Sequence, residues 1–500
     1  MISNENLKSQ VSNLIDSKKE IPIDLSKNVL INPETGYKEF KTSKSVKRVL
    51  QSMNLPVKDE IAVTGLTTKI QGSKPGPNIA IIGELDGLPV PGHPFEDKKT
   101  HAAHACGHHI QLGNMLASLI GLNNKEILDN LTGSVTFIAV PAEEYVEIEW
   151  RSTERDNGSF EFLGGKQEFV KLGEFDDVDI SMMTHARGNF SGFGYGGTGN
   201  GLIAKFIEFR GKSSHAGGDP HLGINALNAA NLALMGIHSN RETFVDSDHI
   251  RVHPIITKGG FVVNQVPEIV TMETFVRGSS IEAIKNANLK VDNALRAGAM
   301  AVGAEVKITT LPGYFPLSHD QNLTNIYKDN LEFSNNQNME LGHGGGSTDM
   351  GDLAHLMPVI HPYVGGATEA SAHTSGFLIE DYNLSVIEAG KMMAYTVIDL
   401  LSDNANLAKK IITDHNPHYT KSKYLKVMRD LSNIEVSNYN LDLWYEFILL
   451  KYLYKSYFYF GNNFISDFLY WYWLEYYIFT YFYNSNFTYG NFFKGKIQVN

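Results

Sequence analysis

Cysteine is almost absent from this chain of 500 residues, and positive charge is in deficit. Cys106 is the single cysteine, so no internal disulfide can form. The formal net charge of −12 argues against nucleic acid as a main partner, because such a partner requires a basic surface. The N-terminal residues show no apolar segment behind a basic start, so no signal peptide is visible. A lone cysteine without an export signal predicts a reducing, cytoplasmic setting.

The strongest candidate for a membrane segment lacks a clean apolar run. Residues 464–483 are rich in aromatic side chains but include Asp467 and Glu475, which makes them a poor transmembrane helix. They belong to an aromatic tail, residues 436–500, whose composition breaks from the rest of the chain. The tail is open to three interpretations: an aberrant extension, an interfacial membrane anchor or an interaction segment. We expect the first, with the tail outside the functional fold and any membrane contact confined to it.

Length and pattern predict an α/β protein with at least two domains. Apolar runs at 78–84, 135–140 and 180–185 alternate with helical patterns, which is typical of a mixed, mostly parallel sheet flanked by helices. Later the expected order is strand, helix, two strands, helix and strand, the ferredoxin-like α+β unit. The predicted division is a first domain over 1–197 and 312–435, an inserted domain over 198–311, and the tail over 436–500.

Side chains that bind metals or move protons follow the ends of the predicted strands. They are Asp86, Cys106, His108, Glu143, Glu144, His185 and His373. Open α/β sheets bind ligands at the carboxyl ends of their strands, so we expect these side chains to converge. Thiolate, imidazole and carboxylate together suit zinc or manganese better than magnesium or calcium. The set exceeds one tetrahedral site but fits two metals that share a bridging group.

The adjacent Glu143 and Glu144 offer a division of labour. One carboxylate can bind a metal while its neighbour takes a proton from an activated water. A solvated loop is the more common reason for two adjacent glutamates. Here the pair follows an apolar strand and Pro141, which places it at the sheet edge instead of on an open surface.

Five short motifs occur in an order that resembles a known family. They are Gly83-Glu-Leu-Asp86-Gly-Leu-Pro, Ala105-Cys-Gly-His108, Pro141-Ala-Glu-Glu144, Thr184-His185 and Ala372-His373. Over roughly residues 50–400 the chain resembles the M20 metal-dependent amidohydrolases and peptidases, related to hippurate hydrolase, auxin-conjugate hydrolases, aminobenzoyl-glutamate hydrolase and carboxypeptidase G. In the inserted domain, Gly211-Lys-Ser-Ser-His215-Ala-Gly is similar to the lid motif of that family.

The resemblance implies a role for each site residue. Two divalent metal ions per subunit, zinc or manganese, would be held by Cys106, His108, Glu144, His185 and His373. Glu143 would be the general base, Asp86 would orient a ligand, and His215 would reach the oxyanion. Asn264, Arg277 and Gly345 would bind the substrate, Gly345 as part of a glycine-rich loop. Relatives dimerise through the inserted domain, so we expect a catalytic domain with a lid and dimerisation domain, a homodimer, and a His215 that the partner subunit can supply.

Three features depart from the family pattern. His109 stands where relatives have Asp or Asn, and Glu84 offers an additional ligand near the metals. After the glutamate pair the chain continues Tyr145-Val-Glu-Ile-Glu-Trp150, with a longer insert to Glu168. His109 and the insert lie close to the expected substrate, and none of the three changes removes a ligand. We interpret His101, His104 and His109 as surface or supporting residues.

The predicted function is hydrolysis of the amide bond of an N-acyl amino acid, or a similar small peptide-like substrate, by a metal-activated water. A dipeptidase or carboxypeptidase of the same family is the first alternative, because acidic residues of the insert would suit a free amine. The second is a catalytically silent paralogue used for binding or regulation. The intact Glu143 and the full ligand set argue against that second alternative.

Overall fold

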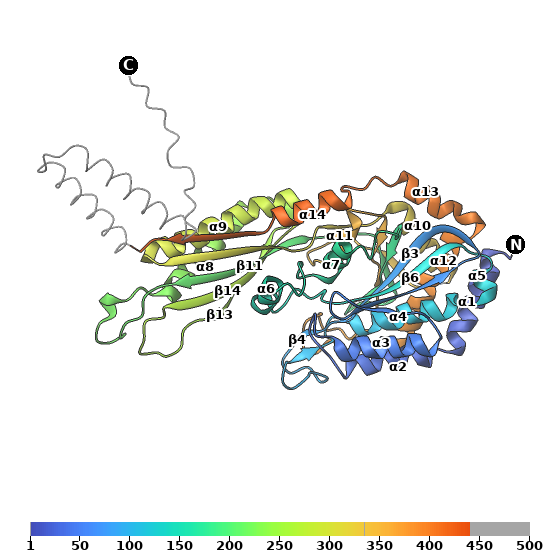
Figure 1. The fold of residues 1–500 in the computed structure, drawn as a ribbon, viewed down its shortest axis with the longest axis horizontal. Coiled ribbons are helices and arrows are strands. Elements are labelled where there is room, and N and C mark those ends of the chain that lie inside the picture. The colour runs from blue at the N-terminus through green and yellow to red at the C-terminus, as the bar shows by residue number, and fades with distance from the viewer. Residues whose placement is uncertain (1, 335, 441–500) are drawn as a thin grey trace, which may run out of the picture.

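The computed structural model describes residues 2–334 and 336–440. The molecule is elongated: one body holds the N-terminus and the central sheet, and a second body projects away from it (Figure 1). Most of the predicted tail, from residue 441 onward, lies outside the described residues. Among the residues described, no helix combines the length and the apolar character needed to span a bilayer.

A six-stranded sheet forms the centre of the first body. Its strands, in order across the sheet, are β1 (Lys58–Ile61), β2 (Gly65–Gln71), β6 (Thr132–Val140), β3 (Lys74–Glu84), β7 (Ile180–Met182) and β19 (Val359–Ile360). The last four strands are mutually parallel, whereas β2 runs antiparallel to both of its neighbours, β6 and the edge strand β1. The carboxyl ends of β3, β6 and β7 therefore meet at one edge of the sheet, as the sequence predicted.

Both faces of this sheet are covered, which explains the continuous apolar runs in the sequence. Along β3, Ile79 and Ile81 pack into one core and Ala80 and Ile82 into the other. The first core includes α1 (Asn4–Ser17), α2 (Glu20–Leu30), α3 (Phe40–Ser52), α4 (His108–Leu122), α10 (Gln321–Phe333), α12 (Ala389–Leu401) and α13 (Asn406–Asp414). The second includes α6 (Ile148–Asp156), α7 (Gly165–Leu172), α11 (Met350–Ala354) and α14 (Lys421–Asp430).

Short strands shape the loops above the carboxyl edge. They are β4 (Leu88–Pro89), β5 (Ala102–Ala103), β8 (His185–Ala186), β9 (Phe193–Tyr195), β10 (Thr198–Gly199), β16 (Leu317–Ser318), β17 (Asn338–Glu340), β18 (His343–Gly344) and β20 (Tyr363–Val364). β10 pairs with β16 and β18, so the entry to the second body lies beside the glycine-rich loop.

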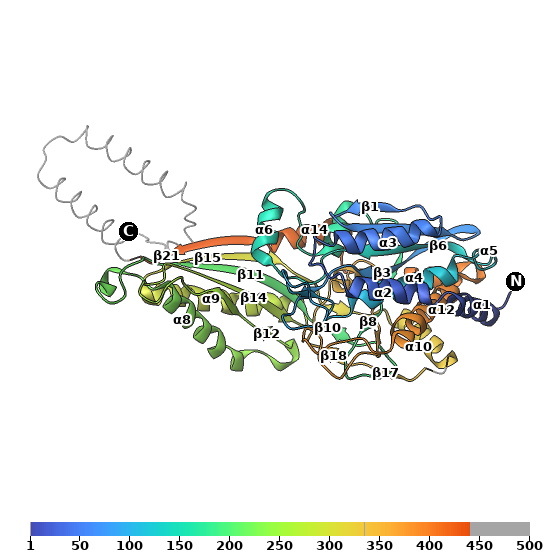
Figure 2. The same ribbon diagram turned by 90° about the horizontal axis from the view of Figure 1, so that it is seen from below.

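The second body, here called the lid, has the predicted strand and helix order except that the strand expected over 250–257 is divided into two, β12 (Arg251–Val252) and β13 (Ile255–Lys258). Its elements are β11 (Gly201–Arg210), α8 (Ala226–Ser239), β12, β13, β14 (Ile269–Gly278), α9 (Ile281–Val302) and β15 (Glu305–Pro312). The strands are antiparallel, with β14 and β15 on either side of β11 and with β12 and β13 beyond β14. Both helices pack on the same face of this sheet (Figure 2).

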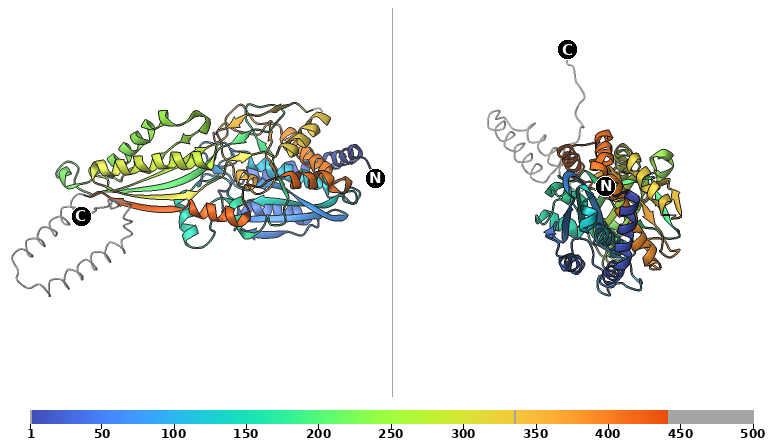
Figure 3. Two further views of the ribbon diagram at one scale, coloured as in Figure 1. Left: turned by 90° about the horizontal axis from the view of Figure 1, so that it is seen from above. Right: turned by 90° about the vertical axis from the view of Figure 1, so that its right-hand side faces the viewer.

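One strand was not expected in the lid. β21 (Asn433–Asn438) pairs antiparallel with β15 along the outer edge of the lid sheet. The chain thus leaves α14 on the first body and returns to the lid, as the orange-red segment in Figure 3 shows. This differs from the predicted division, because the boundary at residue 435 falls inside β21. The strand is polar and gains its partner only from the edge of β15, so composition alone did not indicate it.

Candidate metal centre

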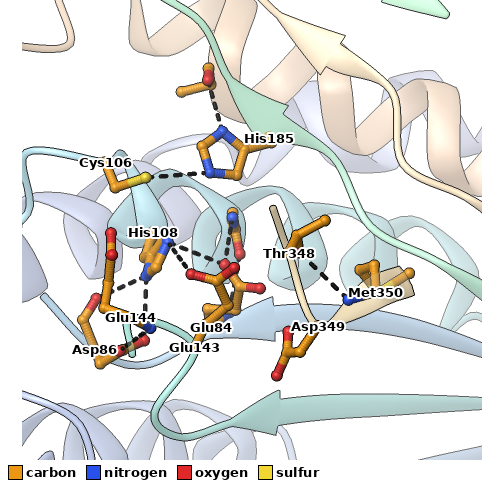
Figure 4. Close-up of polar contacts among 12 residues, drawn as sticks. Glu84, Asp86, Cys106, His108, Glu143, Glu144, His185, Thr348, Asp349 and Met350 are labelled. Atoms are coloured by element: carbon orange, nitrogen blue, oxygen red, sulfur yellow. Dashed lines mark hydrogen bonds and ion pairs between the residues drawn. The ribbon is translucent and has the colours of Figure 1, made fainter. Parts of the chain in front are cut away.

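The five predicted ligands come from four separate segments that meet above the carboxyl edge of the central sheet. Cys106 and His108 stand at the start of α4, and Glu144 follows β6. His185 begins β8, and His373 lies in the loop after β20. Figure 4 shows the Cys106 thiol pointing toward His185, and His108 pointing toward the carboxylates of Glu84 and Glu143.

Local backbone geometry explains why these segments can approach so closely. Gly107 has φ 91°, and a Cβ there would lie 2.7 Å from the Cβ of Ala186, so only glycine fits between Cys106 and His108. His373 also adopts a left-handed conformation, with φ 66°. Its N–H donates to the carbonyl of Ala105 at 2.8 Å, which fixes the loop against the start of α4. Strained backbone of this kind is common at functional sites.

Cys106 joins two groups of possible ligands. One group is Cys106, His108 and His185, and the other is Cys106, Glu144 and His373; within each, the ligand atoms lie within 4.8 Å of one another. The Sγ of Cys106 is 3.4 Å from Nε2 of His185 and 3.3 Å from Nε2 of His373. The five predicted ligands therefore form two overlapping clusters that share the thiol.

Glu143 belongs to a third group, with Glu84 and His108. Nε2 of His108 is 3.1 Å from Oε2 of Glu84 and 3.7 Å from Oε2 of Glu143. Glu84 is fully buried and forms an ion pair with Lys166, which also pairs with Asp349. The negative charge of the Glu84 carboxylate is therefore balanced by Lys166. This ion pair distinguishes Glu84 from the two glutamates after β6.

Asp86 supports both sides of the cluster. Its Oδ1 lies 3.2 Å from Nδ1 of His108, and its Oδ2 accepts the N–H of Glu144 at 2.8 Å. Nδ1 of His108 is also 2.8 Å from the Asp86 carbonyl, so Nε2 faces the cluster. His185 is oriented in the same way, because its Nδ1 lies 2.6 Å from the carbonyl of Ala186. Such contacts to the rear nitrogen are the usual support of metal-binding histidines.

Two buried atoms of the cluster lack hydrogen bonds. Nε2 of His108 and Oε1 of Glu144 are shielded from solvent, yet neither makes a hydrogen bond within the described part of the chain. Each has an oppositely charged group 3.1 Å away, Glu84 and His373 respectively, but not in hydrogen-bond geometry. Buried polar atoms are normally satisfied. Open ligand atoms among thiol, imidazole and carboxylate donors fit divalent metals such as zinc or manganese.

The two adjacent glutamates differ in their electrostatic environment. Burial raises the pKa of Glu143 well above its usual value, and the charges of Glu84 and Glu144 raise it further. For Glu144 burial acts in the same direction, but His373 and His108 outweigh it and lower the pKa. The two adjacent glutamates thus differ in the direction of their pKa shift, upward for Glu143 and downward for Glu144.

The pKa of the Cys106 thiol falls to about 6. Burial and Glu144 oppose this change, but the charges of His185 and His108 outweigh them. The Glu144 carboxylate raises the pKa of His373 to about 11. Cys106 is thus favoured as the thiolate, the form of cysteine that binds metals.

The predicted lid residues fall into two places. The lid joins the first body near Gly197 and at residues 312–314, here called the hinge. Arg277 lies near the hinge end of β14, where Nη1 donates to Oγ of Ser347 at 2.9 Å beside the glycine-rich loop. His215 and Asn264 lie beyond the opposite ends of β11 and β14, and β11 alone is about 30 Å long. His215 is exposed, and its Nδ1 accepts the N–H groups of Gly217 and Gly218. Within one chain, the structure does not bring His215 and Asn264 to the cluster.

The remaining predicted residues have local roles. Gly345 is exposed, and a Cβ added there would meet no atom within 4 Å, so its backbone faces open space. His101 is exposed and pairs with Glu96. His104 and His109 are buried with ring centroids 5.6 Å apart, outside the three ligand groups.

The carboxylates of the insert are largely engaged. Glu147 pairs with Lys38 at 2.8 Å, which also lies over the ring of Trp150. Glu154 accepts a hydrogen bond from Ser159, and Asp156 pairs with Arg155. These partners leave less acidic surface for a free amine than the sequence suggested.

Sequence reasoning missed Lys166, although it is buried at the base of the cluster. Its partners, Glu84 and Asp349, are separated from it by 82 and 183 positions in the chain. A lysine after two glycines carries no periodic signal. The available clue was Asp349, which closes the glycine-rich motif and requires a counter-charge if it is buried.

Comparison with known proteins identifies the same family as the motifs. Residues 80–398 match the model of peptidase family M20/M25/M40. The chain is similar to the Xaa-Arg dipeptidase of Mus musculus, with 26% identity over 419 residues that cover 79% of this chain and 89% of that protein. It is also similar to the N-acetyl-L-cysteine deacetylase of Bacillus subtilis (strain 168), with 24% identity over 405 residues, 78% of this chain and 91% of that protein.

A solved structure shares the fold. The dinuclear metal-binding peptidase of the M20 family from Bacillus subtilis superimposes with a TM-score of 0.57 and 21% identity, covering 76% of this chain and 97% of that one. The predicted α/β fold class and the predicted resemblance are therefore confirmed. Because the family match spans more than half of the residues, the chain belongs to peptidase family M20/M25/M40 and is a hydrolase of that family.

Proposed function

We propose that this protein is a dinuclear metal-dependent amidohydrolase that releases an amino acid from a small N-acyl amino acid. The observation that carries the proposal is the convergence of four ligand side chains on Cys106, with Glu143 beside them. The division of labour expected from the sequence fits this geometry, because Glu144 is in one of the two ligand groups that contain Cys106 and Glu143 is in neither.

In this proposal Cys106, His108, Glu144, His185 and His373 hold two zinc or manganese ions. When bound, such a pair lowers the pKa of water and polarises a carbonyl group. Asp86 keeps His108 and Glu144 in place through the contacts described above. A free thiol as ligand agrees with the reducing, cytoplasmic setting expected from the sequence.

Glu143 is assigned as the general base. It accepts a proton from the attacking water and delivers it to the leaving amine as the amide bond breaks. Its side chain is only 9% exposed, so bulk water does not compete freely for that proton. Arg277 and the loop at Gly345 lie at the lid side of the cluster, where they would bind the substrate carboxylate.

An N-acyl amino acid is favoured over a dipeptide as substrate. A dipeptide brings a free ammonium group, and three of the insert carboxylates, Glu147, Glu154 and Asp156, already have partners. The two curated relatives named above act on a dipeptide and on an N-acetyl amino acid, so both classes belong in the test. A silent paralogue is disfavoured by the retained Glu143.

We further propose a homodimer in which the lid of one subunit completes the site of the other. His215 and Asn264 lie at the far end of their own lid, so they reach the site of a second chain instead of their own. The same end carries exposed apolar side chains, including Phe261 at 78% and Val263 at 99% exposure. Such a patch is typical of a protein contact surface.

The test is a hydrolysis screen with enzyme reconstituted with zinc or manganese. The substrates are N-acetyl and N-benzoyl amino acids on one side and unblocked dipeptides on the other. Glu143→Gln protein, loaded with the same metal, is the matched control for contaminating activity. Release of amino acid from N-acyl substrates supports the proposal, and cleavage of dipeptides alone would replace it with a dipeptidase.

A further inference from the structure

Tyr314 connects the hinge of the lid to the glutamate pair. The ring is buried, and its hydroxyl donates a hydrogen bond to the backbone carbonyl of Glu143. Its own carbonyl accepts the N–H of Leu202 at 2.7 Å, and Leu202 is the second residue of β11. One residue thus touches the chain entering the lid with its backbone and the Glu143 segment with its side chain.

The insert after the glutamate pair forms hydrogen bonds with the two hinge residues before Tyr314. Tyr145 donates through its hydroxyl to the carbonyl of Pro312 at 2.8 Å, and Gln167 donates through Nε2 to the carbonyl of Gly313. The Tyr145 ring also packs edge-on against Tyr314, with centroids 5.5 Å apart. Three consecutive hinge residues are therefore tied to one catalytic-domain segment.

The hydrogen bond from Tyr314 is made to the peptide group between the two glutamates. The Glu143 carbonyl belongs to the peptide unit that joins Glu143 to Glu144. The N–H of the same unit donates to Oδ2 of Asp86 at 2.8 Å. Because a peptide unit is planar, Tyr314 on one side and Asp86 on the other fix its orientation. That orientation sets the directions in which the two glutamate side chains leave the backbone.

We propose that Tyr314 is a positioning residue that couples the orientation of the lid to the aim of the Glu143 carboxylate. The proposal rests on the proposed function in that Glu143 is taken as the general base. It also gives the insert, the feature that departs from the family pattern, a role: Tyr145 anchors the hinge from which Tyr314 reaches Glu143. Small misplacements of a reacting group are costly, because catalysis depends on near-attack geometry.

The first test compares two buried tyrosines that each donate to a backbone carbonyl. Tyr314→Phe removes the bond to Glu143, whereas Tyr37→Phe removes a bond to the carbonyl of Phe162 and leaves both bonds of the peptide unit between Glu143 and Glu144 intact. In metal-loaded enzyme we expect Tyr314→Phe to lower kcat by about 10-fold or more, with KM within about 2-fold. Metal content stays at the wild-type value, and Tyr37→Phe keeps kcat within about 2-fold.

A merely structural role for Tyr314 predicts a different pattern. Both variants would then lose similar thermal stability, and kcat per metal-loaded site would be unchanged in each. That result, or a loss of metal that accounts for the lost activity, would overturn the positioning role. If wild-type enzyme hydrolyses none of the amides in the screen, the proposed function fails instead, so the two failures are distinguishable.

The second test asks whether the lid acts through Tyr314. Tyr145→Phe releases the anchor at Pro312 and leaves the bond to Glu143 intact. We expect Tyr145→Phe to lower kcat by about 3-fold in wild type but to have little effect in the Tyr314→Phe background, because coupled residues are not additive. Independent effects in this double-mutant cycle, or no effect of Tyr145→Phe alone, would overturn the coupling.

Discussion

The two ends of the lid are built differently. At the hinge end, Arg277 contacts Ser347 and Tyr314 contacts Glu143, so the lid is joined to the catalytic domain by specific bonds. At the far end, the His215 ring accepts hydrogen bonds from the N–H groups of two glycines of its own loop, and Val263 is 99% exposed. The same small domain is thus bonded to the first body where it borders the cluster and exposed at its other end.

The contrast between the two ends of the lid distinguishes the parts of the proposed site that one chain forms alone from the parts that it does not form. The ligand clusters are formed by side chains of a single chain, all of them buried or half-buried except the exposed His373. The far end of the lid carries His215, Asn264 and exposed apolar side chains, all remote from these clusters. We infer that metal binding is a property of the single chain, whereas full catalysis depends on an assembly of two.

The largest effects are expected within the cluster. Glu143→Gln should lower kcat by about 10²–10⁴ with metal content unchanged, because it removes a general base and leaves the ligands. Glu144→Gln should instead lose metal, since a carboxylate ligand becomes a neutral amide. Elemental analysis and kcat on both proteins provide the measurement. An active Glu143→Gln variant beside a Glu144→Gln variant with full metal would reverse the two assignments.

The next effect tests the far end of the lid. His215→Ala should lower kcat by about 10²–10³ with metals retained, as expected for a lost donor to the oxyanion. Mixing inactive His215→Ala with inactive Glu143→Gln should restore activity, because a hybrid dimer has one site with both residues intact. No recovery after proven subunit exchange would mean that each chain completes its own site, and the contrast between the two ends would fail.

Features of the fold and the site were predictable from the sequence where they depend on residues close together in the chain. The strand ends that carry Asp86, Glu143 and His185 follow from apolar runs and short motifs, and the helix expected over 281–302 is α9. Lys166 was missed because burial of a lysine is decided by carboxylates far away in the chain. The positions of His215 and Arg277 at opposite ends of the lid required the antiparallel register of β11 and β14.

A smaller effect probes the shared thiol without measuring activity. Cys106 is the only thiol in the chain, so alkylation reports on one atom. If Cys106 is a ligand, zinc should slow its modification by about 10-fold or more relative to metal-free protein, because the metal holds the reactive thiolate. His215→Ala should show the same protection, since the far end of the lid is not part of the cluster. Equal rates with and without zinc would exclude Cys106 as a ligand.

The smallest effects are expected from the C-terminal segment, and two cuts separate its parts. Deleting residues 441–500 keeps β21 and should leave kcat/KM within about 2-fold, because all five proposed ligands and the hinge residues precede residue 441. Deleting residues 433–500 also removes β21, its ladder with β15 and the ion pair of Arg296 with Glu435. An exposed strand edge and a lost ion pair should lower Tm by a few degrees, with metal content unchanged. Thermal unfolding and elemental analysis of both truncated proteins provide the comparison. Loss of metal after either cut would show that the C-terminal segment supports the cluster, and the separation between the cluster and the outer lid would no longer hold.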